Sequence, residues 1–396
     1  MLVATYIDLT AAYDHVPRDF LFRIIQIRTG ASHLVAILRK MYEGTTAVIR
    51  GMDVKFDVLV GCRQGGQESP VLFNLYFDYV LKIAAHEVDK AFPNGWGIDF
   101  KYIIPYMCTN RKQRKHGKMS GIELVKWILY ADDVVLFSKT AQEAEQILTI
   151  IDDTCKRFGL SISFNKTKTQ VFNNKELSEK PSIITVNENE IENVKDFIYL
   201  GQLFTTDDDA CFTDLRISRA IAKFNELRKV LCDTDINLRT RRKFLYACVR
   251  TRLTYGVEAY FPNEQQITRL EACWNQLLRS MVKGGWKRIN SDDDADENDY
   301  RFIYSNADIQ KILKTTSLRD VIYEKHIRYI GHVCRLPNTA IAKKLLFACP
   351  FRQYYRNPWL KIADLLGVDE NQAKRATQNR KEFHGLVSSR FKPTQR

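Results

Sequence analysis

The chain has 396 residues, 45% of them hydrophobic and 27% charged, so it can bury two or three cores and is too apolar to be disordered. Its formal net charge of +13 suggests a polyanionic partner, although a basic surface can also serve solubility alone. Nine cysteines without a Cys-x-x-Cys pair argue against a disulfide framework or zinc site and for a reducing compartment.

No apolar run reaches the roughly 18 residues of a transmembrane helix, and no basic segment precedes the first apolar residues as in a signal peptide. An intracellular protein without a membrane partner is therefore expected. Residues 1–8 predict a buried strand that begins at once, which suggests that sequence is missing upstream.

The next part of the chain alternates predicted helices with short strands. A helix is expected after Pro17 and another over residues 33–42, followed by a hairpin around Gly51. Residues 61–70 form a Gly-rich polar loop, and an apolar helix runs from Val71 to about Ala85. Residues 93–121, with a basic run at 111–116, are interpreted as an irregular exposed insertion.

Two apolar runs, residues 128–130 and 134–137, flank Asp132 and Asp133 and predict a hairpin with both carboxylates at its tip. Taken alone, such a pair is an ordinary solvated turn. An amphipathic helix over residues 141–158, ended by Gly159, then leads to a strand through Phe172 and a short apolar turn at 197–201.

From about Phe212 the composition changes to basic helices. An apolar stripe is predicted to face a core, and the arginines and lysines, Arg216 among them, are predicted to lie on the other faces. Further helices are expected over residues 267–282 and 317–336, separated by a disordered acidic linker at 292–299.

Five motifs in a fixed order carry a resemblance to a known family: Tyr6-Ile7-Asp8-Leu9-Thr10-Ala11-Ala12-Tyr13-Asp14, the loop from Arg63 to Asn74, Tyr130-Ala131-Asp132-Asp133, Gly159-Leu160 with Asn165-Lys166-Thr167, and Tyr199-Leu200-Gly201. Together they resemble the polymerase core of reverse transcriptases, and more closely those of non-LTR (LINE-type) retrotransposons, over about residues 1–210. Residues 253–258 and 328–337 look like segments that follow this core in such elements.

The resemblance implies an RNA-directed DNA polymerase that extends a DNA primer on an RNA template with deoxynucleoside triphosphates. Nucleotidyl transfer of this kind uses two divalent ions, here Mg²⁺ with Mn²⁺ as a substitute, held by hard oxygen ligands. The family pattern makes Asp8 and Asp132 the principal metal ligands, with Asp133 assisting. Lys166 would protonate the leaving pyrophosphate, and Lys168 is a nearby substitute.

The same resemblance assigns the substrate contacts. Tyr13 would pack under the nucleotide sugar and exclude a 2′-hydroxyl, or it is simply a core residue. Arg63, Gln64 and Gly65 would contact template and nucleotide, although the loop departs from the commonest family pattern at residues 66–68. Arg63 could instead pair with a surface carboxylate, and Lys166 could be a solvated side chain. The primer grip would be Tyr199, Leu200 and Gly201.

The expected fold is α+β: a polymerase palm with a small antiparallel sheet packed on helices, then an all-α thumb and a C-terminal helical region. The boundaries are 1–210 for the palm, 211–290 for the thumb, 291–300 for the linker and 301–396 for the last region. Only seven residues precede Asp8, so we expect a truncated enzyme without fingers or endonuclease. The alternative is a non-catalytic nucleic-acid-binding relic; the family places either in the nucleus.

Overall fold

The computed structural model describes residues 2–49, 51, 54–63, 65–102, 121–172, 184–206, 212–282, 286–288, 300–348 and 358–391. The chain forms two compact units. Unit 1 comprises Met1–Phe100 and Glu123–Asp208, and unit 2 comprises Lys101–Ile122 and Asp209–Arg396. The predicted basic run at 111–116 and the acidic linker at 292–299 lie outside the described residues. No helix within the described ranges is both long and apolar enough to cross a lipid bilayer.

A six-stranded sheet forms the centre of unit 1. Its strands are β1 (Leu2–Ile7), β6 (Trp127–Tyr130), β7 (Asp133–Ser138), β8 (Lys168–Phe172), β9 (Ile184–Val186) and β10 (Asn189–Asn193). They lie in the order β6-β7-β1-β8-β10-β9, and every neighbouring pair is antiparallel except β8 with β10. The predicted strand at the start of the chain therefore occupies the middle of the sheet, where β-branched and aromatic residues pack on both faces.

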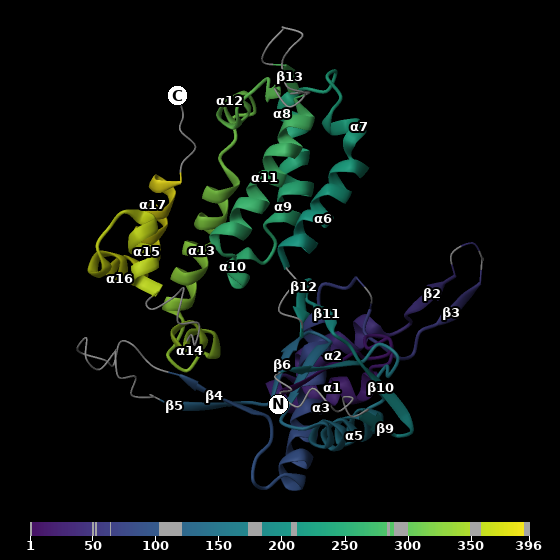
Figure 1. The fold of residues 1–396 in the computed structure, drawn as a ribbon. Helices are drawn as coiled ribbons and strands as arrows, with labels where there is room; N and C mark the ends of the chain where they lie inside the picture. Colours follow the sequence, from purple (N-terminus) through teal and green to yellow (C-terminus); the bar gives the residue numbers. More distant parts are fainter. Residues whose placement is uncertain are drawn as a thin grey trace. The chain divides into compact units, whose positions relative to one another are not determined.

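Helices cover one face of this sheet (Figure 1). They are α1 (Arg18–Thr29), α2 (Ser32–Tyr42), α3 (Ser69–Ala91) and α5 (Ala141–Arg157). The α5 helix begins where the Thr140 hydroxyl accepts a hydrogen bond from the Glu143 amide, and it ends before Gly159, whose φ of 74° allows the left-handed turn. Helix α3 continues six residues beyond its expected end at Ala85, since no proline interrupts it before Pro93.

Alternation along β1 separates two sets of side chains. Val3 and Ile7 belong to the main core under the helices, whereas Ala4 and Tyr6 face the other side of the sheet with Val135. On that second side lies a hairpin made of β11 (Asp196–Tyr199) and β12 (Gln202–Thr205). Asp8 follows Tyr6 by two positions, so the strand period of two directs it toward the hairpin side.

Two further strand pairs are separate from the six-stranded sheet (Figure 1). The predicted hairpin around Gly51 is confirmed as β2 (Thr46–Val48) paired with β3 (Lys55–Asp57). The expectation of an irregular 93–121 segment is wrong at its two ends, because β4 (Ile98–Tyr102) pairs with β5 (Gly121–Val125). The apolar residues of β4 alternate as in a strand, and the glycines of the segment hid that pattern in the sequence.

Unit 2 is mainly helical. Its first core is formed by α6 (Phe212–Glu226), α7 (Arg228–Leu231), α8 (Leu238–Phe244), the π-helical turn η2 (Leu245–Arg250), α9 (Thr251–Leu253), α10 (Val257–Tyr260), α11 (Glu264–Met281), α12 (Asn306–Ile312) and the start of α13 (Leu318–Arg335). A second core lies between the end of α13 and α14 (Ile341–Ala348), α15 (Pro358–Leu366), α16 (Glu370–Gln378) and α17 (Arg380–Arg390). A small ribbon joins β13 (Trp286–Arg288) to β14 (Tyr300–Phe302).

Two arginines of these basic helices are buried, although the sequence pattern placed Arg216 on a face away from the core. The Arg216 guanidinium lies 4.3 Å from the Phe212 ring centre and 4.8 Å from that of Tyr255, and burial lowers its pKa to about 10. Arg241 donates to the carbonyls of Leu231 and Met281. Both side chains fill gaps between helices, which a charge count along the sequence does not reveal.

The overall architecture is thus α+β, as predicted: helices on one face of a small, mostly antiparallel sheet, followed by a mainly helical region. Within unit 2, the first core includes Ile309 and Ile322 beside Leu231 and Trp274, so helices on both sides of residues 291–300 share it.

Candidate active site

Asp8 and Asp133 meet at the ends of two neighbouring strands. The antiparallel register of β1 with β7 runs from Val3 opposite Ser138 to Ile7 opposite Val134, so the next step sets Asp8 opposite Asp133. Both aspartates are half-buried and both line a cavity of about 220 Å³ on the hairpin side of the sheet. Residues separated by 125 positions in the sequence therefore contribute carboxylates to one place.

Asp132 lies in the tight turn between β6 and β7. Ala131 has a φ of 55°, and Tyr130 pairs with Asp133 across the turn. The small side chain of Ala131 tolerates this left-handed conformation at a modest cost. Asp132 does not line the cavity, but it is close enough to Tyr13 for its charge to contribute, after burial, to a raised pKa of that phenol.

The electrostatics of this edge favour a bound cation. The pKa of Asp133 is raised, first by burial and then by the negative charges of Asp132 and Asp8. The buried Oδ1 of Asp8 has no hydrogen-bond partner among the described residues. Crowded carboxylates with an unsatisfied oxygen are a suitable donor set for a hard divalent ion. Still, no three acidic, histidine or cysteine side chains in the described part of the chain converge as a ready-made metal site.

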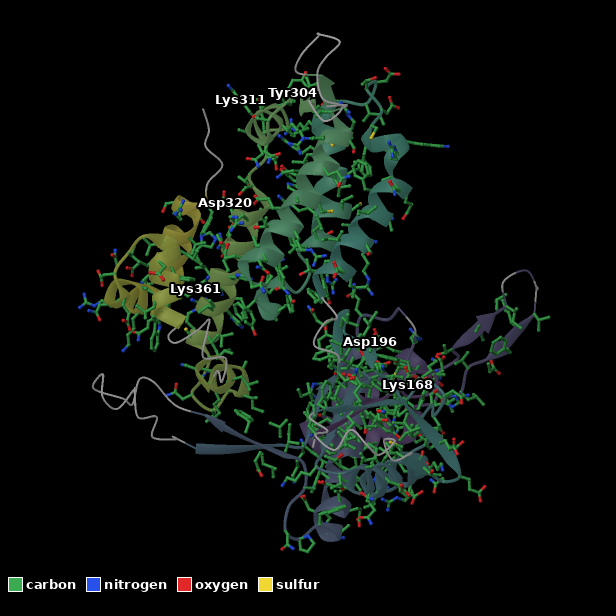
Figure 2. The ribbon with its side chains drawn as sticks, viewed as in Figure 1. Lys168, Asp196, Tyr304, Lys311, Asp320 and Lys361 are labelled. Carbon is green, nitrogen blue, oxygen red and sulfur yellow. The ribbon has the colours of Figure 1, made fainter. Side chains whose placement is uncertain are left out.

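The structure distinguishes the two candidate lysines. The Nζ of Lys166 lies 3.6 Å from Oδ1 of Asp8 and lines the same cavity, with 69% of its side chain exposed. Lys168, labelled in Figure 2, instead donates to Glu192 at 2.7 Å and to the Asn165 carbonyl. Lys166 is thus the cation beside the aspartates, and Lys168 serves the pairing of β8 with β10.

The β11–β12 hairpin forms the opposite wall of the cavity. Leu200 and Gly201 have φ values of 48° and 76°, which is the two-residue turn that keeps the twist of the flanking strands. Tyr199 and Leu200 line the cavity, and the Tyr199 hydroxyl donates to the Asp133 carbonyl at 3.4 Å. Burial and the charge of Asp133 raise the pKa of Tyr199 to about 12, so this tyrosine stays a neutral donor.

A buried glutamine, which no sequence pattern indicated, links this hairpin by hydrogen bonds to β1, the strand that ends just before Asp8. Gln170 on β8 accepts a hydrogen bond from the Tyr6 hydroxyl at 2.7 Å and donates to the carbonyls of Lys195 and Phe204. The Tyr6 ring also stacks on Phe197 with 4.0 Å between centres. One feature of the sequence indicated that Tyr6 lies beside the site: it precedes Asp8 by two residues and therefore lies on the same face of the strand.

The Gly-rich loop lies against the segment that follows Asp8. Gly61 has a φ of 86°, and a Cβ there would come within 2.8 Å of the Asp14 carbonyl oxygen. The amide of Cys62 donates to the Tyr13 carbonyl at 2.7 Å. Glycine is therefore required for the loop to approach this closely.

The substrate-contact residues predicted in this loop are only partly visible. The Arg63 guanidinium donates to the Met41 carbonyl and lies 5.2 Å from the Tyr42 ring centre. Gly65 adopts a φ of 83°, and Gln64 lies outside the described residues. Tyr13 stacks on Phe73 with 4.5 Å between ring centres but is not fully buried, so one part of its ring reaches the surface beside Asp132.

Comparison with known families decides the classification. Residues 2–204, about half of the chain, match the sequence profile described as "Reverse transcriptase (RNA-dependent DNA polymerase)". The chain belongs to the reverse transcriptase family. The match includes Asp8, Asp132, Asp133, Lys166, Lys168 and most of the β11–β12 hairpin, and it ends before α6.

Two solved structures are also similar to this reverse transcriptase. One is telomerase from Candida albicans in complex with a TWJ fragment of telomeric RNA, at 12% identity and a TM-score of 0.37, covering 80% of this chain and 51% of that one. The other is apo telomerase from Candida tropicalis, at 11% identity and a TM-score of 0.35, covering 91% and 53%. The chain thus spans about half the length of the solved structures it matches.

Proposed function

We propose that this reverse transcriptase is the polymerase of a non-LTR retrotransposon and extends a DNA primer on an RNA template. The observation that carries the proposal is the convergence of Asp8 and Asp133 on one cavity, with Asp132 in the adjoining turn and Lys166 beside Asp8. Carboxylates that crowd at the edge of a sheet, next to a single ammonium group, suit phosphoryl transfer better than structural packing.

Asp8, Asp132 and Asp133 would hold the metal, two Mg²⁺ ions for which Mn²⁺ can substitute. When bound, these ions supply charge neutralisation at the reacting phosphate. Lys166 holds the proton that the leaving pyrophosphate takes up, since its exposed Nζ is close to Asp8. Lys168, engaged with Glu192, would not take that role.

The remaining contacts are assigned to the substrate. Tyr13 would exclude a 2′-hydroxyl from the sugar, which its position beside Asp132 supports. Arg63, Gln64 and Gly65 would contact the template and the incoming deoxynucleoside triphosphate. Tyr199, Leu200 and Gly201 would grip the primer end, because their turn forms the wall opposite the carboxylates.

For the whole chain we propose a palm over residues 1–210 and a thumb over 211–290 that follows the primer–template duplex through its phosphates. A linker at 291–300 and a helical region at 301–396 complete the proposed domains. Copying of a retrotransposon RNA onto chromosomal DNA would take place in the nucleus.

Primer extension tests this proposal. The chain is given an RNA template with an annealed DNA primer, first with Mg²⁺ and then with Mn²⁺, and is compared with Asp132→Asn. Asp19→Asn is the matched control, because Asp19 lies on α1 with a 95% exposed side chain. Extension by the unmodified chain and by Asp19→Asn, with loss in Asp132→Asn, supports the assignment. Equal extension by all three proteins contradicts it.

The second candidate is a nucleic-acid-binding protein without turnover. It is favoured by one observation: the described residues contain no three ligating side chains already gathered for a metal. Under this alternative the chain binds the duplex in a salt-dependent manner, and no extension occurs with either ion. Extension by the unmodified chain excludes it.

A further inference from the structure

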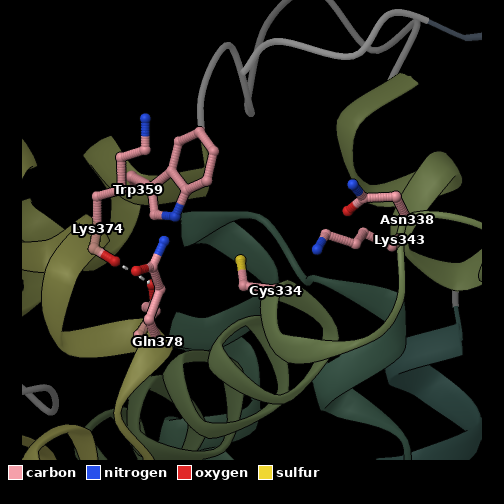
Figure 3. A pocket seen from close by; sticks show the side chains of 7 residues that line it. Cys334, Asn338, Lys343, Trp359, Lys374 and Gln378 are labelled. Atoms are coloured by element: carbon pink, nitrogen blue, oxygen red, sulfur yellow. Dashed lines mark hydrogen bonds between the residues drawn. The ribbon is translucent and has the colours of Figure 1, made fainter. Parts of the chain in front are cut away.

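A second cavity, of about 210 Å³, lies within the C-terminal helices of unit 2 (Figure 3). It is bounded by the end of α13, by α14, and by α15 and α16. Figure 3 shows Trp359, Lys374 and Gln378 on one side of Cys334, with Asn338 and Lys343 on the other. The lining comprises Cys334, Asn338, Lys343, Trp359, Lys374, Thr377 and Gln378. The family match ends far upstream of these residues, so membership of the family assigns them no role.

The lining of this cavity is positively charged. It contains two ammonium groups, those of Lys343 and Lys374, and the described lining residues include no carboxylate. The charges of Lys343 and Arg335 both reach Cys334, but burial outweighs them and raises the pKa of the thiol to about 11. The thiol is therefore neutral and does not offset the ammonium charges.

Neighbouring cations strengthen this field. Arg335 donates to the Thr377 carbonyl at 3.1 Å, at the rim of the cavity. Its pKa is lowered, first by burial and then by the positive charge of Arg380. Cations crowded in this way raise the local positive potential, which an anion would relieve.

Both lysines are held in position by the fold. The Nζ of Lys343 donates to the Leu336 carbonyl at 2.8 Å, close to the end of α13. The Nζ of Lys374 lies 5.1 Å from the centre of the Trp359 ring and forms no ion pair with a described carboxylate. Lysines ordered before binding lose less side-chain entropy when they contact an anion.

We propose that this cavity binds one nucleotide unit by its phosphate and sugar. The ammonium groups of Lys343 and Lys374 would contact phosphate oxygens, and the carboxamides of Asn338 and Gln378 can both donate to and accept from sugar hydroxyls. The volume of about 210 Å³ is below the roughly 300 Å³ of the smallest drug-sized pockets, so the cavity suits the phosphate and sugar of one nucleotide, with the base outside it. The same chemistry is presented by a free nucleotide and by one residue of a single strand.

This inference depends on the proposed function in one respect only, which is that the ligand is a nucleotide or a nucleic acid. Its test therefore measures binding and not extension, so that failure of one leaves the other standing. The full chain is titrated with adenosine monophosphate, with inorganic phosphate and with single-stranded oligoadenylate, by calorimetry and by tryptophan fluorescence. Trp359→Phe identifies the share of the fluorescence change that arises at the cavity, since the chain has five tryptophans.

The double variant Lys343→Gln with Lys374→Gln is expected to weaken binding of adenosine monophosphate about ten-fold or more, because two charge-assisted hydrogen bonds are lost. Lys381→Gln is the matched control, since Lys381 is exposed on α17 and does not line the cavity. Helix content and the melting temperature of each variant show that the fold is retained. Equal weakening in the control and the double variant, or no binding by the unmodified chain, overturns the proposal.

Comparing the affinities of the three ligands shows whether the site takes a free nucleotide or one residue of a single strand. Tighter binding of oligoadenylate than of the monophosphate, with both sensitive to the double variant, supports a site for a strand. Equal affinities support a site for free nucleotides. If inorganic phosphate binds as tightly as the monophosphate, the sugar contributes nothing and the nucleotide assignment is wrong.

Discussion

The two units use charged residues for different purposes. In unit 1, Asp8, Asp132 and Asp133 lie at strand ends and at a turn, where they repel one another and raise the pKa of Asp133. In unit 2, Arg216 and Arg241 are buried between helices, where aromatic rings and carbonyl oxygens receive them. Like charges that repel one another beside a cavity indicate a ligand, whereas charges placed against aromatic rings and carbonyl oxygens indicate packing.

The difference follows from the elements themselves. A sheet brings together residues from distant parts of the chain at one edge, so β1 and β7 can combine Asp8 with Asp133. Helices bring together mainly side chains that are three or four residues apart. The free backbone groups at helix ends find hydrogen-bond partners nearby, as at the start of α11, where Asn263 and Gln266 form a capping box. The variants below change single side chains in each unit and test the role that each side chain has there.

The largest effect is expected at the lysine beside the aspartates. Lys166→Ala should lower the rate of primer extension about 1,000-fold, because a positioned proton donor contributes that order of magnitude. Lys168→Ala, two residues away, should change the rate less than about ten-fold, since Lys168 pairs with Glu192. Single-turnover extension measures both. Equal losses would mean that the 3.6 Å contact of Lys166 with Asp8 has no catalytic meaning.

The stability of unit 2 is expected to depend on pH through His326. Burial lowers the pKa of His326 from 6.5 to about 4. The 2.8 Å bond from its Nε2 to the Val257 carbonyl and the charge of Glu258 oppose this shift, and the charges of Lys361 and Lys325 add to it. The unfolded chain therefore binds a proton first as the pH falls. Stability should be retained above about pH 6.5 and decrease by up to about 3 kcal/mol by about pH 4.

Urea unfolding of the full chain across this pH range, followed by helix signal, measures the decrease. His326→Gln is the comparison, because the glutamine carboxamide reaches the position of Nε2 and can donate to the Val257 carbonyl but does not titrate. The free energy of unfolding is plotted against pH for both proteins. The difference between the two slopes is the contribution of His326, because the carboxylates are the same in both. Identical pH dependence in both would contradict the assignment.

In unit 1, Gln170→Leu should lower the free energy of unfolding by about 2 kcal/mol. Leucine keeps the size of the side chain but removes the partner of the buried Tyr6 hydroxyl and of the partly buried carbonyls of Lys195 and Phe204. Tyr6→Phe removes only one of these bonds and should cost about 1 kcal/mol. Denaturant unfolding measures both; a larger loss for Tyr6→Phe would refute the central place of Gln170.

The smallest effects concern two glycines of the C-terminal helices. Gly331 on α13 packs on the Phe383 ring, which a Cβ would overlap, so Gly331→Ala should destabilise unit 2 by about 1 kcal/mol despite the better helix propensity of alanine. Gly385 on α17 has open space, and Gly385→Ala should stabilise by about 0.5 kcal/mol. Thermal unfolding distinguishes the signs, and the same sign for both would contradict the packing described.

Much of this arrangement was predictable from sequence patterns. Alternating β-branched and aromatic residues indicated β1 and the β6–β7 hairpin, and Gly159 marked the end of α5. The family motif favoured Lys166 over Lys168, but the physical reason is absent from the sequence pattern, because it depends on which side of the start of β8 each lysine occupies. The buried Arg216 was also missed, since the helix presents Ala220 and Arg216 to the core and leaves Ile221 38% exposed.

The role of Gln170 could not be deduced because its three partners lie far away in the sequence. Tyr6 is on β1, Phe204 is on β12 and Lys195 lies just before β11, and they become neighbours of Gln170 only in the folded chain. Likewise, the meeting of Asp8 with Asp133 requires β1 to pair with β7, which the family resemblance implied but no local pattern contains.

Binding of Mn²⁺ tests most directly whether these carboxylates form a metal site. The full chain is titrated in the presence of primer and template, and free Mn²⁺ is followed by electron paramagnetic resonance. The unmodified chain and Asp19→Asn should bind Mn²⁺ with equal affinity, whereas Asp8→Asn should bind about ten-fold or more weakly. Undiminished binding by Asp8→Asn would contradict the account, because Asp8 would then hold no metal.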